Sequence, residues 1–245
     1  MIPPNPHARF WLFDFDNTLA TLEREVDWPG SRRELEAYLR AEGVDQEIFA
    51  EIPRGNLPLY TALHSRWLRA LNGLVSPSPA EAGDLLRHAS EIIERHELVG
   101  AERAAPTPGA IDLLKAIAAC GAVAIIVTSN SSRTVTYWLG RHRAGNLVRA
   151  IVGRDSLLAL KPSPEMVVRA LELGAVSIAD AVFVGDSLAD FEAACAAGLG
   201  FYGIATSGSV RDRLIAAGAT DIFASPAALQ IHLNLTPPAP VPDSK

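Results

Sequence analysis

The sequence predicts an α/β fold, in which helices cover both faces of a parallel sheet and an all-helical segment is inserted after the first strand. Three observations predict it: short apolar β-type runs end in polar residues, a helical pattern follows them, and this alternation stops between Leu19 and Pro106. Strands that are apolar on both faces and alternate with helices are typical of parallel sheets. Ligands of such folds bind at the carboxyl ends of the strands.

The β-type runs lie on both sides of the interruption. They are Phe10–Asp16, Val123–Asn130, Ala150–Arg154, Ala181–Asp186, Phe201–Thr206 and Asp221–Ala224. Residues 109–119 carry apolar side chains at near-helical spacing after a Pro-Gly start signal, which predicts a helix. Ser163 followed by Pro164 predicts the start of another helix, with Ser163 as its cap.

The interruption predicts a separate helical domain. Residues 20–105 show helical patterns only, at 32–42, 57–71 and 79–96, and their number suits a four-helix bundle. We therefore expect an α/β core domain of residues 1–19 and 106–235 and a helical domain of residues 20–105. The last ten residues contain four prolines, which predicts a flexible tail over 236–245.

Composition excludes several classes of protein. Hydrophobic residues make up 49% and charged residues 20%, which indicates a globular chain and excludes a disordered one. The longest apolar runs, 116–127 and 193–205, fall short of the roughly 20 residues that a membrane-spanning helix needs. The N-terminal residues show no secretory signal, so we expect a cytoplasmic protein.

Net charge and cysteine content limit the kinds of binding partner and of metal or disulfide site that we expect. The formal net charge of −6 disfavours nonspecific binding to nucleic acid or to anionic membranes and favours a small diffusible substrate. Cys120 and Cys195 lie far apart in Ala-rich segments, so we expect two buried thiols and neither a disulfide nor a zinc site. For the oligomeric state the sequence leaves a monomer and a homodimer open.

Two carboxylates close the first predicted strand. Asp14 and Asp16 lie in the segment DFDNTL, where the strand turns into a loop and side chains two residues apart can face one pocket. Aspartate and asparagine are also common in ordinary surface turns, so this doublet alone leaves both interpretations open.

Polar residues near the ends of two further strands add to the doublet. Thr128, Ser129 and Asn130 precede a helix, where hydroxyls, amides and backbone N–H groups suit a phosphate. Asp186 ends the run AVFVGD, and Asp190 lies one helical turn further along the same face. A short polar turn and an acidic helix N-terminus are the ordinary alternatives.

Lys161 completes the pattern, because it precedes a predicted helix start and supplies a compact positive charge beside an anion. The four segments together resemble the haloacid dehalogenase-like superfamily, and specifically its phosphatases. DFDNTL matches that family's DxDxT motif, Thr128 its Ser/Thr after an apolar strand, Lys161 its lysine and GDSLAD its GDxxxD motif. Any one motif is weak, and their order along the chain carries the resemblance.

The resemblance covers the core on both sides of the insert. It implies a Rossmann-like sheet, with residues 20–105 as a helical cap that closes over the site. The segment after GDSLAD is similar to the C-terminal part of phosphoglycolate phosphatases. We therefore expect a Mg²⁺-dependent phosphatase that hydrolyses a small phosphorylated metabolite.

The resemblance also implies roles for individual residues. Asp14 is expected to be the nucleophile that forms an aspartyl-phosphate, and Asp16 the general acid and base. Mg²⁺ is expected at the carboxylates of Asp14 and Asp186 and the backbone carbonyl of Asp16, with Asp190 supporting it indirectly. The transferring oxygens are expected to be held by Thr128 and Lys161.

Further substrate contacts are expected on both sides of the site. On the core side these are Asn17, Ser129 and Asn130. In the insert we expect Arg54 and Asn56, because the PRGNLP turn lies between two predicted helices and is bounded by proline and glycine.

Three alternative functions are compatible with parts of this pattern. Asp16 argues against a dehalogenase, because the dehalogenases of the superfamily lack this second aspartate. A sugar-phosphate mutase or phosphotransferase is the nearest alternative, although mutases usually carry glycine at the position of Asn17. A non-catalytic binding protein is disfavoured, because Asp14, Asp16, Lys161 and Asp186 are all present.

Overall fold

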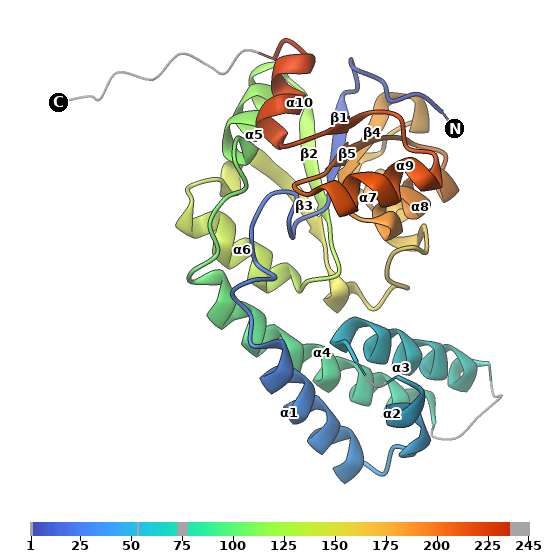
Figure 1. Cartoon of the computed structure of the whole chain (residues 1–245). Coiled ribbons are helices and arrows are strands. Elements are labelled where there is room, and N and C mark those ends of the chain that lie inside the picture. Colours follow the sequence, from blue (N-terminus) through green and yellow to red (C-terminus); the bar gives the residue numbers. More distant parts are fainter. Residues whose placement is uncertain (1, 53, 73–77, 236–245) are drawn as a thin grey trace.

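The computed structural model describes residues 2–52, 54–72 and 78–235 (Figure 1). The predicted flexible tail, residues 236–245, lies outside the described residues. The two ends of the described chain both lie on the core, on the side away from the helical insert (Figure 1).

A six-stranded parallel sheet forms the centre of the core. Its strands are β1 (Phe10–Phe13), β2 (Val123–Val127), β3 (Val148–Val152), β4 (Ala181–Gly185), β5 (Gly200–Ile204) and β6 (Ile222–Phe223). They are ordered β3-β2-β1-β4-β5-β6, and all neighbours run parallel. The chain winds outward from β1 in one direction and from β4 in the other, so the predicted α/β fold class is confirmed.

Helices cover both faces of this sheet. Those of the core are α5 (Ala110–Ala119), α6 (Ser132–Arg141), α7 (Glu165–Gly174), α8 (Leu188–Ala196), α9 (Gly208–Ala217) and α10 (Pro226–His232), with 3-10 turns η1 (Gly145–Leu147), η2 (Arg154–Ser156) and η3 (Ile178–Asp180). Side chains alternate along β1: Leu12 joins the apolar cluster that contains α7 and α8, whereas Trp11 and Phe13 join the cluster that contains α5, α6 and α10.

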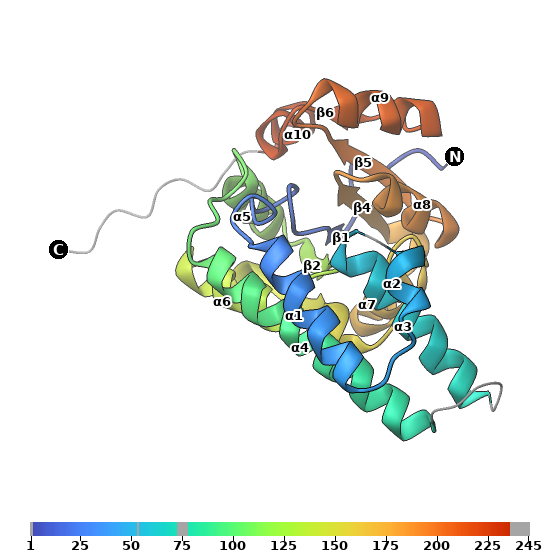
Figure 2. The same ribbon diagram turned by 60° about the horizontal axis from the view of Figure 1, so that its bottom comes forward.

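The described residues of the insert form four helices, which lie together on one side of the core (Figures 1 and 2). They are α1 (Trp28–Ala41), α2 (Glu47–Glu51), α3 (Asn56–Leu71) and α4 (Pro79–Ala101). Both α1 and α3 pack against α4, and their buried leucines Leu35 and Leu59 belong to the same apolar cluster as Leu12 of β1. The insert is thus continuous with one face of the core.

The 23-residue helix α4 reaches from the insert to the core, where it contacts α6. The chain enters and leaves the insert through two segments that run side by side. Thr21 N–H donates to Ala105 O at 2.9 Å, and Thr107 N–H donates to Leu19 O at 2.9 Å.

Several local predictions were wrong. Ser163 is not the cap of α7, because the helix begins at Glu165 and Pro164, with helical backbone angles, occupies the N-cap position. Cys120 and Cys195 are exposed rather than buried. Cys120 follows the last turn of α5, and in the Ala-rich helix α8 the uniform apolar composition around Cys195 does not mark which face is buried.

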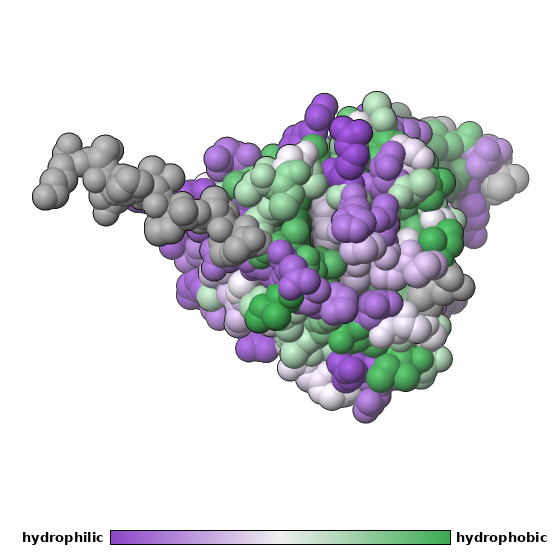
Figure 3. Space-filling view, turned by 90° about the horizontal axis from the view of Figure 1, so that it is seen from above, coloured by the Kyte–Doolittle hydropathy of each residue, from purple (hydrophilic) through white to green (hydrophobic). Residues whose placement is uncertain are grey.

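Among the described residues, no helix combines the length and the apolar character needed to cross a membrane. The face of the core that lies away from α1, α2 and α3 mixes hydrophilic and hydrophobic residues (Figure 3).

Candidate active site

The carboxyl ends of three neighbouring strands bring predicted site residues to one edge of the sheet. Asp14 follows β1, Thr128 follows β2 and Asp186 follows β4. The sheet ladder continues to Asp14 and Thr128: Asp14 N–H donates to Val184 O at 2.9 Å, and Thr128 N–H donates to Val152 O at 3.0 Å. The rigid sheet therefore fixes the backbone from which these side chains project, at the point where the strand order reverses.

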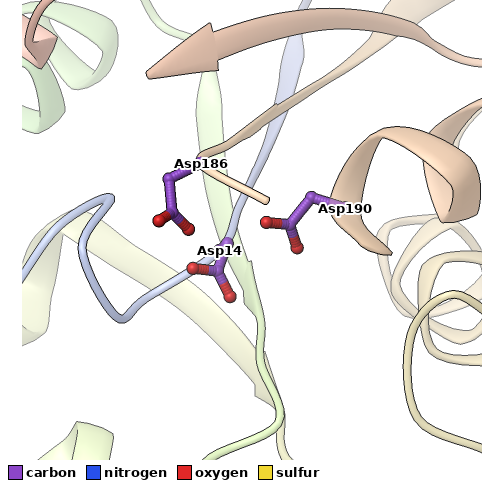
Figure 4. A group of neighbouring side chains, drawn as sticks. All are labelled: Asp14, Asp186 and Asp190. Atoms are coloured by element: carbon purple, nitrogen blue, oxygen red, sulfur yellow. The ribbon is translucent and has the colours of Figure 1, made fainter. Parts of the chain in front are cut away.

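Three carboxyl groups converge at this edge. Asp14, Asp186 and Asp190 turn toward one another (Figure 4), and one oxygen from each lies within 4.8 Å of the others. Asp190 reaches the group from the first turn of α8, where Ser187 N–H donates to its Oδ2 at 3.0 Å in a capping box. Asp14 and Asp190 are 6% and 1% exposed, so two of these anions are almost fully removed from water.

Lys161 is the cation that faces this group. Its Nζ donates to Asp14 Oδ1 at 2.5 Å, to Asp190 Oδ1 at 2.5 Å and to Val127 O at 3.0 Å. An ammonium group has three hydrogens, so all of them are used. Lys161 thus partly neutralises Asp14, and a phosphate oxygen could reach its ammonium only by sharing or replacing one of these contacts.

Burial raises the pKa values of two carboxyl groups at this edge, because the single lysine does not offset the loss of water. Burial raises the pKa of Asp14 to about 6, although Lys161 opposes the shift. Burial, with repulsion from Asp14 and Asp190, raises the pKa of Asp186 to about 9. Burial tends to lower the pKa of Lys161, but the carboxylates of Asp14 and Asp190 outweigh it and raise that pKa above its ordinary value.

Asp16 lies beside this group and borders the same cavity as Asp14. Burial raises its pKa to about 7, although the bond that its Oδ1 accepts from Glu23 N–H at 2.9 Å opposes the shift. A carboxyl group with a pKa near neutrality can both give and take a proton. Asn17 follows with a positive φ of 59°, a backbone conformation that asparagine and glycine adopt most readily.

Thr128, Ser129, Asn130 and Ser131 form the loop between β2 and α6, which we call the 128–131 loop. Thr128 Oγ1 donates to Asn130 Oδ1 at 3.0 Å and accepts from Asn130 N–H at 3.1 Å. Ser131 caps α6 by accepting from Thr134 N–H at 3.1 Å. The loop is therefore closed on itself through its own side chains.

All the residues predicted from sequence border one cavity of about 750 Å³ between the core and the insert. From the core these are Asp14, Asp16, Asn17, Thr128, Ser129, Asn130, Lys161, Asp186 and Asp190, and from the insert Arg54 and Asn56. Trp28, Pro29 and Leu57 add apolar surface on the insert side. The structure thus assembles in one place residues that lie up to 176 positions apart, Asp14 and Asp190 being the extremes of the core set.

The two predicted residues of the insert differ in their surroundings. Arg54 is exposed at the cavity, whereas Asn56 is 5% exposed at the start of α3 and donates to Ser31 Oγ at 2.9 Å. Among the described residues, Asn56 Oδ1 has no hydrogen-bond partner. Arg32 holds the turn that carries Arg54, because its guanidinium donates to Ile52 O at 2.6 Å and Gly55 O at 2.7 Å.

The sequence prediction missed two buried charged residues beside the 128–131 loop, Glu97 of α4 and Arg154 of η2. Both are fully buried, and they pair with each other. A signal was present for Glu97, because Ile93, Glu97 and Ala101 share one face of a helix at four-residue spacing and the other two are apolar. Arg154 lies two residues after the end of β3 and ends the predicted apolar run Ala150–Arg154, but nothing in that position indicates that it pairs with α4.

The carboxylate group suits a divalent cation. Mg²⁺ prefers hard oxygen ligands, and the three carboxyl groups that converge here offer such oxygens. Asp190 already uses Oδ1 for Lys161 and Oδ2 for Ser187, so Asp14 and Asp186 are better placed for direct coordination. The donor set therefore fits the predicted metal.

Comparison with known proteins shows that the chain belongs to a known family of hydrolases. A family model described as haloacid dehalogenase-like hydrolase matches residues 76–204, more than half of the chain. A phosphoglycolate phosphatase from Pseudomonas putida is 33% identical over 97 residues, which are 40% of this chain and 36% of that protein. The chain thus matches about a third of the length of such curated relatives.

Solved structures extend the likeness over nearly the whole fold. A variant of CbbY from Rhodobacter sphaeroides in complex with xylulose-1,5-bisphosphate has a TM-score of 0.60 and 27% identity, covering 91% of this chain and 96% of that one. A hydrolase from Pseudomonas syringae has a TM-score of 0.61 at 24% identity, covering 92% of this chain and 98% of that one, which bears on the fold alone.

Proposed function

Because the chain belongs to the haloacid dehalogenase-like hydrolase family, we propose that it hydrolyses small phosphate monoesters through a phosphorylated Asp14. One observation carries this proposal. Lys161 Nζ bridges Asp14 and Asp190 at 2.5 Å each, in a cavity that Asp16, Thr128 and Asp186 also border. A carboxylate beside a fixed cation, next to a second carboxyl group of near-neutral pKa, suits two-step phosphoryl transfer.

In the first step an oxygen of Asp14 attacks phosphorus, and the bond between phosphorus and the ester oxygen breaks. Asp16 gives its proton to the departing alkoxide. In the second step Asp16 takes a proton from water, which attacks phosphorus, releases phosphate and regenerates the Asp14 carboxylate. The pKa of about 7 for Asp16 lets it serve in both directions near neutral pH.

The other residues hold the phosphate. The N–H and hydroxyl of Ser129 are the proposed donors to its oxygens, with Asn130 and Asn17 beside them. Thr128 Oγ1 joins them when its hydrogen turns from Asn130 Oδ1 to the phosphate. Lys161 neutralises Asp14, so that a dianionic ester can approach a carboxylate.

We propose Mg²⁺ as the cofactor, held by the carboxylates of Asp14 and Asp186 and the carbonyl of Asp16, with Asp190 holding Lys161 next to it. When bound, the cation supplies positive charge for the anionic oxygens of the phosphate. The surplus of carboxyl groups over cations in this site supports the assignment.

The substrate is proposed to be a small phosphorylated metabolite, and residues 20–105 are proposed to act as a cap over it. The cavity of about 750 Å³ accommodates a small organic phosphate, and the apolar side chains of Trp28 and Leu57 contribute to its lining from the insert. Arg54 offers a positive charge to a second anionic group, such as the carboxylate of phosphoglycolate, the substrate that the names of several relatives indicate.

The test is phosphate release from a panel of small esters, including phosphoglycolate, sugar phosphates and nucleoside monophosphates, with and without Mg²⁺. The proposal expects metal-dependent release that Asp14→Asn abolishes. No release from any ester, together with isomerisation of a sugar phosphate in the presence of a bisphosphate, would assign the chain to the mutases of its superfamily instead.

A further inference from the structure

A buried ion pair joins the insert to the core directly behind the 128–131 loop. Glu97 lies on α4, and Arg154 follows β3, and both side chains are 0% exposed. Arg154 Nη1 donates to Glu97 Oε1 at 2.7 Å, and Nη2 donates to Oε2 at 3.1 Å, so the guanidinium binds the carboxylate with two parallel bonds.

Every N–H of the Arg154 guanidinium has an acceptor. Besides the two bonds to Glu97, Nη1 donates to Ser129 O at 2.8 Å, Nη2 to Ser90 O at 3.2 Å and Nε to Ser90 Oγ at 3.1 Å. These are the five donors that an arginine possesses. Arg154 N–H also donates to Asn130 O at 2.9 Å. The carbonyls of Ser129 and Asn130 are therefore both bound to Arg154 and cannot face an incoming anion.

Glu97 holds the same loop from the other side. Its Oε1 accepts from Asn130 Nδ2 at 3.1 Å, and its Oε2 accepts from Ser131 N–H at 3.1 Å. A carboxylate is an acceptor only, so the NH₂ of Asn130 must face Glu97 and its oxygen must face Thr128 Oγ1. Glu97 thereby fixes the orientation of the amide that orients the Thr128 hydroxyl.

We propose that Glu97 and Arg154 are positioning residues for the phosphate-binding 128–131 loop, through which the helical insert sets the geometry of the active site. This inference rests on the proposed function of the loop. Neither residue is among those that border the cavity, so both act through Asn130, Ser129 and Thr128 rather than on the substrate.

The alternative is a purely structural pair, and energetics argue against it. Burying an ion pair carries a large desolvation cost, and hydrophobic residues of similar volume often stabilise such a position equally well or better. Stability alone therefore does not require charges here. The pair instead supplies several fixed hydrogen bonds to one loop, which apolar side chains cannot do.

The test uses variants that separate stability from positioning. In Arg154→Lys the charge stays and the paired geometry is lost. In the double variant Glu97→Leu/Arg154→Met both charges are removed together, so that none is left unpaired. We expect the double variant to fold with a lowered thermal midpoint, because Ser131 N–H and the carbonyls of Ser129 and Ser90 lose their partners. Measured well below that midpoint, kcat/KM for the best ester should fall about 10- to 100-fold in both variants, because small misplacements of catalytic groups have effects of this size.

Glu94→Gln is the matched control. Glu94 lies one turn earlier on α4 and pairs with Arg133 of α6 at 3.2 Å, so it also joins α4 to the core but has no bond to the 128–131 loop. We expect wild-type kinetics from it. A folded double variant with wild-type kcat/KM would overturn the proposal, whereas an inactive wild type would instead overturn the proposed function.

Amide hydrogen exchange on the wild-type protein gives an answer even if the variants do not fold. The proposal expects Ser131 N–H, held by Glu97, and Arg154 N–H, held by Asn130 O, to exchange as slowly as the buried part of α4. Exchange at the rate of an exposed loop would show that the loop is not held, and the proposal would fail.

Discussion

Two buried groups of charged side chains lie in the part of the chain that the structure describes, and they differ in their balance of positive and negative charge. At the edge of the sheet, Lys161 faces the carboxyl groups of Asp14, Asp186 and Asp190, and Asp16 lies beside them. Behind the 128–131 loop, Glu97 and Arg154 form a pair of opposite charges. We call the first the unbalanced group and the second the balanced pair.

The difference in charge balance separates a candidate ligand-binding site from a pair whose hydrogen bonds are made within the protein. In the unbalanced group, burial together with the neighbouring aspartates raises the pKa of Asp14 to about 6 and that of Asp186 to about 9, and the single lysine only partly opposes these shifts. In the balanced pair, every N–H of the guanidinium already has an acceptor in the protein. The first has one lysine for several carboxyl groups, which is why we propose a bound cation there, and the second is balanced by its own two side chains.

The largest effect is expected in the unbalanced group, from Asp14→Asn. Removing the nucleophile should lower phosphate release by at least about 10⁴-fold, because an amide cannot form the proposed intermediate. Circular dichroism and the thermal midpoint should show an intact fold. Asp112→Asn, at an exposed aspartate of α5 paired with Lys115, is the control and should keep full activity. Substantial activity in Asp14→Asn would remove Asp14 from the mechanism.

The comparison predicts opposite changes in stability when one charge is removed from each group. Arg154→Met leaves the buried Glu97 without an opposite charge and should lower the free energy of unfolding by about 3–5 kcal/mol. Asp186→Asn removes a carboxyl group that the folded, metal-free protein must keep protonated at neutral pH, and it should raise that free energy on the order of 1–3 kcal/mol. Urea unfolding with EDTA measures both. Destabilisation by both substitutions would contradict the distinction between the two groups.

Asp186→Asn also sharpens the metal assignment. Replacing a charged ligand with a neutral one should raise the Mg²⁺ concentration for half-maximal activity by about tenfold or more. The measurement is phosphate release at a series of Mg²⁺ concentrations. An unchanged titration would exclude Asp186 as a ligand.

The raised pKa values predict how Mg²⁺ and pH act together on stability. The folded, metal-free protein keeps protons on Asp14, Asp16 and Asp186 up to about pH 6, 7 and 9, whereas these groups lose them near pH 4 in the unfolded chain. The folded state binds more protons over this window, so stability should fall as pH rises through it.

Mg²⁺ binds deprotonated carboxylates, so it should raise the thermal midpoint more at pH 8 than at pH 6. Differential scanning fluorimetry with and without Mg²⁺ at the two pH values tests this, and Ca²⁺ serves as a second cation of the same charge. A larger effect at pH 6 would contradict the sign of the pKa shifts.

The smallest effect is expected outside both groups, at the exposed Arg54. Arg54→Ala should raise KM for an ester with a second anionic group by about tenfold or less and leave kcat nearly unchanged, because an exposed charge contributes little binding energy. Arg69→Ala, near the end of α3, is a control on the same insert. Equal KM values for Arg54→Ala and wild type would leave Arg54 without a role in binding.

The sequence predicted much of the core site, for a physical reason. Asp14, Thr128 and Asp186 each follow an apolar strand, and parallel strands bring their carboxyl ends to one edge, so local pattern and topology together imply proximity. The six strands were likewise marked by their apolar runs. Their ends were predicted too far, because the polar residues that follow a strand already belong to the loop.

The balanced pair could not be predicted in the same way. Glu97 and Arg154 lie 57 positions apart on elements whose contact depends on how α4 docks on the core, and no motif records that docking. The cysteines show the same limit: in Ala-rich helices, apolar composition alone does not say which face is buried. Charges on an apolar stripe, such as Glu97, are the signal to look for.

The most direct test of the central claim is a rapid-quench experiment with a ³²P-labelled ester, Mg²⁺ and an excess of protein, stopped in acid and followed by peptide mapping. The account predicts a transient label on the peptide that contains Asp14, formed before phosphate is released and absent from Asp14→Asn. Phosphate release without any labelled peptide, or label on a different residue, would contradict it.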